Sequence, residues 1–86
     1  MDEKTLNSLM EDFTDLYETK PYLSLEKYYT YTSDIFGDCI LLKFKWFNST
    51  TCDVLREILL GYDKLHWCVV TSDDNLINIA IAQGCF

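Results

Sequence analysis

The sequence predicts an α+β fold whose elements follow in the order helix, strand, strand, helix, strand, strand. Two segments place apolar residues at helical spacing, four others favour strands, and turn residues separate the strands. Because each segment has one apolar face, the economical arrangement is a four-stranded, mainly antiparallel sheet with both helices on one face. At 86 residues, we expect a single domain over residues 1–86.

The first helix is predicted over residues 4–18. Its apolar side chains recur at helical spacing and form one stripe, made of Leu6, Leu9, Met10, Phe13, Leu16 and Tyr17. We expect the helix to stop at Lys20, because Pro21 follows and the residue before a proline is pushed away from helical angles.

The first hairpin is predicted to join strands at 22–32 and 39–47 through turn residues 33–38. One face of its first strand collects Leu23, Leu25, Tyr29, Tyr31 and the charged Lys27. A lysine among apolar neighbours indicates a bulge or an edge position. The outward face would then hold Glu26, Tyr28, Thr30 and Thr32. The second strand alternates well, with inward side chains at Ile40, Leu42, Phe44 and Trp46.

The second half of the chain predicts a helix followed by two strands. Thr50 and Asp53 have the spacing of a capping box at the start of this helix. Its buried stripe would comprise Val54, Leu55, Ile58 and Leu59, with Tyr62 as a further candidate. Strands are expected at 65–71 and 76–82. The second of these could instead be a helix capped by Asp73 and Gly84, but three isoleucines at spacing two favour the strand.

Composition and charge limit which partners and which cellular location we expect for this chain. The chain is 49% hydrophobic, which is ample for a core, and it carries a net charge of −7. That charge disfavours DNA, RNA and anionic membranes as direct partners. The apolar runs are too short to span a membrane, and the first residues lack the pattern of a signal peptide. We therefore expect a cytoplasmic protein.

The sequence predicts neither catalysis nor a cofactor. No phosphate-binding, dinucleotide-binding, metalloprotease or hydrolase motif is present. The cysteines are Cys39, Cys52, Cys68 and Cys85, and none forms the close pair of a zinc site. We expect reduced thiols that fill apolar space and no metal site. Pairing of His66 with one cysteine as a nucleophilic dyad is the enzyme alternative.

Negative charge is concentrated in the first helix. Residues 1–19 hold six acids and one lysine, so they carry −5 of the net −7. Four of the acids lie within about a third of the helix circumference, opposite the apolar stripe; they are Glu11, Asp12, Asp15 and Glu18. Carboxylates so arranged can occupy lysine and arginine sites meant for phosphates. The alternative is a solvated face that serves solubility.

These features give a candidate binding surface. The acidic residues Glu11, Asp12, Asp15, Glu18 and Glu26 would contact a basic partner protein such as a nuclease, and an exposed Tyr28 would anchor the contact.

In general character, the chain resembles the small acidic inhibitor proteins of phages and mobile elements, such as anti-CRISPR proteins and DNA mimics. The resemblance rests on the short chain that starts at Met1, the acidic face and the tyrosines at 28, 29 and 31. It implies a non-catalytic inhibitor that caps the nucleic-acid site of a bacterial effector nuclease, and a place in the host cytoplasm if a phage encodes the protein. Two alternatives are an interaction module that forms a homodimer and a toxin-immunity protein.

Overall fold

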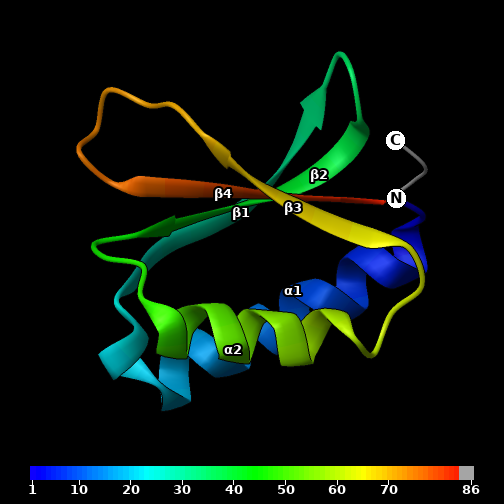
Figure 1. Ribbon diagram of the computed structural model, residues 1–86. Helices are drawn as coiled ribbons and strands as arrows, with labels where there is room; N and C mark the ends of the chain where they lie inside the picture. The colour runs from blue at the N-terminus through cyan, green and yellow to red at the C-terminus, as the bar shows by residue number, and fades with distance from the viewer. Residues whose placement is uncertain (84–86) are drawn as a thin grey trace.

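The computed structural model describes residues 1–83, and within this range two α-helices pack on a four-stranded sheet. The elements are α1 (Glu3–Thr19), the 3-10 turn η1 (Pro21–Leu23), β1 (Leu25–Ser33), β2 (Gly37–Phe44), α2 (Ser49–Leu59), β3 (Leu65–Val70) and β4 (Ile77–Gln83). Neighbouring strands are antiparallel, and both helices lie on one side of the sheet (Figure 1). The predicted α+β class and element order are confirmed.

The strand order β1-β2-β4-β3 places the last strand inside the sheet. The chain passes through α2 to the edge strand β3 and then returns as β4 between β2 and β3. Ile79 and Ile81 of β4 are completely buried, and Ala80 and Ala82, which alternate with them, are also buried. A segment buried on both faces needs apolar side chains at successive positions, which explains its isoleucine and alanine content. The helical alternative for this segment is wrong.

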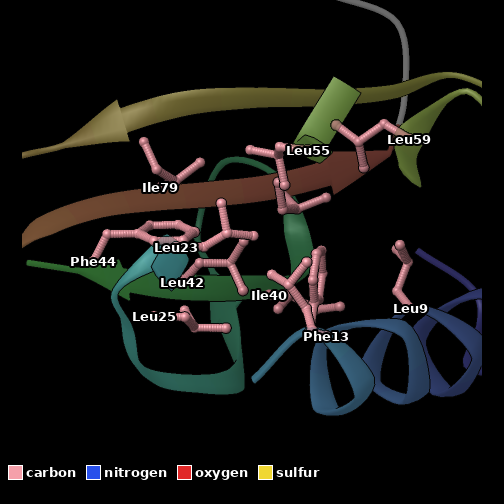
Figure 2. Packing of buried hydrophobic residues seen from close by; sticks show 12 residues of the cluster. Leu9, Phe13, Leu23, Leu25, Ile40, Leu42, Phe44, Leu55, Leu59 and Ile79 are labelled. Carbon is pink, nitrogen blue, oxygen red and sulfur yellow. The ribbon is translucent and has the colours of Figure 1, made fainter. Parts of the chain in front are cut away.

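The core lies between the sheet and the helices (Figure 2). It combines Leu9, Phe13 and Leu16 of α1, Leu55 and Leu59 of α2, and Leu23, Leu25, Ile40, Leu42, Phe44, Ile79 and Ile81. The predicted inward positions of β2 are confirmed except Trp46, which is 50% exposed because the strand already ends at Phe44. Phe47 takes its place, with its ring 5.6 Å from Phe44 and 5.5 Å from Trp67.

Both helices begin at side-chain caps. Asp2 accepts a hydrogen bond of 2.7 Å from the Thr5 amide, and this bond lowers the pKa of the Asp2 carboxyl. At α2 the cap is Asn48, whose Oδ1 accepts from the Thr51 amide at 3.1 Å. The predicted capping box at Thr50 and Asp53 is therefore wrong: asparagine is an equally good cap, and it comes first along the chain.

The predicted bulge lies in β1, where the pairing with β2 shifts between Leu25 and Lys27. Leu25 faces the core before the bulge. One extra residue reverses the alternation beyond it, so Tyr28, opposite Leu42, faces the helices. The expectation that Tyr28 points outward is wrong for this reason.

Tyr28 connects β1 to α1. Its hydroxyl donates to Thr14 Oγ1 at 2.9 Å, and Thr14 Oγ1 in turn donates to the Met10 carbonyl at 2.8 Å. Its ring centroid lies 5.6 Å from that of Tyr17. Tyr28 therefore stabilises the packing of sheet against helix.

We expect Tyr28→Ala to lower the free energy of unfolding by about 2 kcal/mol or more, because it removes a core-facing ring and a hydrogen bond. Tyr29→Ala, one residue along and 42% exposed on the other face, should cost less than about 1 kcal/mol. Urea denaturation of both variants measures the difference. Equal losses would contradict the orientation of β1 described above.

Candidate protein-binding surface

Three of the predicted acids form a line along the outer face of α1. Glu11, Asp15 and Glu18 are exposed, on the side opposite the buried Leu9 and Phe13. A rise of 1.5 Å per residue separates the first from the last by about 10.5 Å. In the described range, 1–83, the ion pairs involve other residues, so these three carboxylates face solvent without a cation of their own chain. We call Glu11, Asp15 and Glu18 the acidic row.

Asp12 is turned away from the acidic row toward α2. Its Oδ2 accepts a 2.5 Å hydrogen bond from the hydroxyl of Tyr62, which lies just beyond α2. The same hydroxyl is 2.8 Å from Ser8 Oγ. Burial of Tyr62, together with its bond to Asp12, raises the pKa of the tyrosine. Asp12 therefore holds α1 against the segment after α2, a role that differs from the predicted partner contact.

A groove between the two helices extends the acidic surface. The groove has a volume of about 350 Å³ and is lined by Asp12, Asp15, Leu16, Lys20, Val54, Glu57 and Ile58. Glu57 of α2 is exposed and adds a carboxylate that sequence reasoning missed. The sequence shows that Glu57 lies on the polar side of the second helix. Its place in the same groove as Asp15 depends on the packing of α2 beside α1, which the sequence pattern does not show. Negative charge thus continues from the acidic row onto α2.

Glu26 and Tyr28 do not join the acidic row. Glu26 is exposed at the β1 bulge, where its Oε1 lies 3.1 Å from Lys45 Nζ. Tyr28 is half-buried under α1. Exposed aromatic rings are instead supplied by Tyr17 and Trp46, which border one hollow together with Glu26. The sequence pattern predicts both rings at apolar, inward positions, so it does not indicate that they are exposed.

The helix-free face of the sheet carries a separate polar cluster. Lys43 Nζ binds the Asp74 carboxylate, which also accepts hydrogen bonds from the Leu76 amide and Asn78 Nδ2. The hydrogen bond from Lys43 holds the pKa of Asp74 well below its ordinary value of 3.8. This cluster fastens the β3–β4 turn to β2, and we regard it as structural.

The thiols of the described residues form no disulfide. Cys39 is buried, Cys52 half-buried and Cys68 exposed, and all three are free; Cys85 lies outside the described residues. Burial raises the pKa of the Cys39 thiol. Among residues 1–83, no group of three or more histidine, cysteine and acidic side chains is arranged to hold a metal ion. No helix in this range has the length and apolar character needed to cross a membrane.

Comparison of the chain with protein-family models, with curated proteins and with solved structures finds no match. The function is therefore inferred from the residues themselves.

Acid unfolding tests the Lys43–Asp74 pair. Because the pKa of Asp74 is lowered in the folded state, its contribution to stability is present above pH 3.8 and is lost as the pH falls below that value. Between about pH 5 and pH 2, the free energy of unfolding should fall more steeply for the native protein than for Asp74→Asn. Asp73→Asn, at an exposed carboxylate outside the ion pairs of residues 1–83, is the control and should keep the steep slope. Parallel profiles for the native protein and Asp74→Asn would contradict the assignment.

Proposed function

We propose that this protein is a non-catalytic inhibitor that binds the basic cleft of a nucleic-acid-binding effector protein. The observation that supports it is the acidic row, Glu11, Asp15 and Glu18, aligned on one rigid helix and unpaired within the described chain. The partner would be a bacterial nuclease or a related effector, so we expect the protein to act in the cytoplasm, which is the host cytoplasm if a phage encodes it.

The spacing of the acidic row suits sites that normally hold phosphates. Glu11 and Asp15 are about 6 Å apart along the helix axis, close to two base-pair rises of about 3.4 Å. Lysine and arginine side chains of a nucleic-acid cleft would donate charge-assisted hydrogen bonds to these carboxylates. Long-range attraction between a chain of net charge −7 and a basic cleft would also speed their association.

The helix that carries the acidic row is held firmly in place. Leu9, Phe13 and Leu16 bury its opposite side in the core, and Asp12 and Thr14 fix its two flanks through hydrogen bonds to Tyr62 and Tyr28. The carboxylates would therefore bind without much further loss of backbone entropy, which favours affinity.

The test is capture of a partner from bacterial lysate by the immobilised protein, followed by washes of increasing salt. A basic nucleic-acid-binding protein should be retained at low salt and released by high salt or by added DNA. Asp15→Lys with Glu18→Lys should weaken its capture about 100-fold or more, because two attractive contacts become repulsive.

The matched control is Asp34→Lys with Asp73→Lys, which changes the net charge equally at exposed sites in the β1–β2 and β3–β4 turns, away from α1. This variant should capture the partner normally, and circular dichroism should show both variants folded. Equal loss in the two variants would mean that only overall charge matters. That result, or unchanged capture by the α1 variant, would overturn the proposal.

A second candidate function is self-association through β3. This edge strand has no charged residue, and Val69 on it is 70% exposed. The other edge strand, β1, carries Glu26, Lys27 and a bulge, the usual protection against pairing with another chain.

If β3 pairs with β3 of a second copy, sedimentation should show a concentration-dependent dimer that persists at high salt. Val69→Lys should convert this dimer to monomer. Ile35→Lys, at a residue 82% exposed in the β1–β2 turn, should leave it intact. A native protein that stays monomeric at every concentration would exclude this function.

A further inference from the structure

A hollow with aromatic walls lies near the C-terminal end of α1. It measures about 340 Å³ and is lined by Tyr17, Pro21, Ser24, Leu25, Glu26, Lys45 and Trp46. Figure 1 shows the segments involved, which are the η1 turn, the start of β1 and the connection from β2 to α2, at one end of the molecule. The rings of Tyr17 and Trp46 are 47% and 50% exposed. Two large exposed rings at one hollow are typical of a recognition site.

The backbone around this hollow is fixed by Ser24. Its Oγ accepts from the Trp46 amide at 3.1 Å and donates to the Trp46 carbonyl at 2.9 Å, while its own carbonyl accepts from the Lys45 amide at 3.0 Å. Ser24 itself is buried and has a φ of 64°, a left-handed conformation that is unfavourable for a residue with a side chain. The fold thus tolerates local strain and holds Trp46 in place while its ring stays exposed.

The surroundings of the hollow attract a cation. Glu26 on its wall already accepts the ammonium group of Lys45 through Oε1. The last turn of α1 has no basic side chain, and Lys20 at its C-cap lines the groove between the helices, so the carbonyl ends leave partial negative charge near the hollow. The faces of tryptophan and tyrosine rings add electrostatic attraction for a cation. An exposed ion pair such as Lys45–Glu26 contributes little stability, so an incoming cation can displace the lysine.

We propose that this hollow binds an arginine side chain of the partner, with the guanidinium group over Trp46 and Tyr17 and hydrogen-bonded to Glu26. This inference rests on the proposed function and specifies how a basic partner is recognised beside the acidic row. Arginine fits better than lysine because its planar group stacks on rings, donates two parallel hydrogen bonds to one carboxylate and is more weakly hydrated. Glu18 of the acidic row directly follows Tyr17 in the last turns of α1, so both proposed contact regions include residues of this helix end.

The test uses the isolated protein and a capped Gly-Arg-Gly peptide, followed by heteronuclear NMR. The indole N–H signal of Trp46 should shift and saturate with a dissociation constant in the millimolar range, as expected for one side chain. The indole N–H signal of Trp67, on β3, should not shift and serves as an internal reference. The matched peptide with citrulline, which has the shape of arginine without its charge, should produce no saturable shift.

Two variants support the assignment. Trp46→Ala should abolish the response of the remaining lining residues to the arginine peptide, and its fold should persist because Ser24 contacts only the Trp46 backbone. Glu26→Gln should weaken binding about tenfold. Equal shifts with arginine and citrulline, or unchanged binding by Trp46→Ala, would overturn the inference.

The outcome is separable from that of the proposed function. If the peptide fails to bind while the Asp15→Lys, Glu18→Lys variant still loses its partner, the arginine site is wrong and the inhibitor proposal stands. If the peptide binds and the Asp15→Lys, Glu18→Lys variant captures the partner as well as the native protein does, the hollow is a guanidinium site and the inhibitor proposal is wrong.

Discussion

The bulge between Leu25 and Lys27 determines which side chains of β1 meet α1. Because side chains alternate strictly along a strand, one additional residue exchanges the two faces of everything that follows it. Tyr28 thereby reaches Thr14, and α1 is seated with its apolar stripe on the sheet and its acids outward. The same segment places Glu26 beside Lys45, close to Trp46. Both proposed contact regions therefore depend on this local departure from regular strand geometry.

Charge is divided between two uses in this molecule. In the part of the chain that the structure describes, the ion pairs join Lys43, Lys45 and Arg56 to Asp74, Glu26 and Asp53, which lie outside α1. The acids of the acidic row lack such neighbours, so they repel one another by a few tenths of a kcal/mol per pair. A helix that serves only as cover for a core gains nothing from this repulsion. An external cation, in contrast, would relieve it, which is why the row suggests a basic partner.

Local patterns predicted the elements well, because helical and strand periodicity are properties of neighbouring residues. Leu9, Phe13, Ile79 and Ile81 were placed correctly on this basis. The surface was predicted less well, because it depends on contacts between distant segments. The bond of Asp12 to Tyr62 and the place of Glu57 in the groove both require that α2 packs beside α1. The orientation of Tyr28 depends on the pairing of β1 with β2. The sequence predicts an inward Trp46 because the alternation of apolar and polar residues continues to position 46, whereas strand β2 ends at Phe44.

The central position of β4 has a consequence for how the protein is made. During synthesis, β1 and β2 can form their hairpin early, but β3 has no neighbour until Ile77–Gln83 has left the ribosome. Before then, the apolar side of β2 and the faces of both helices lack the strand that covers them. Such incomplete chains expose apolar surface and unpaired strand edges, which make them prone to aggregate or to bind chaperones. From this strand order we expect the core of the nascent chain to close only after β4 has joined the sheet.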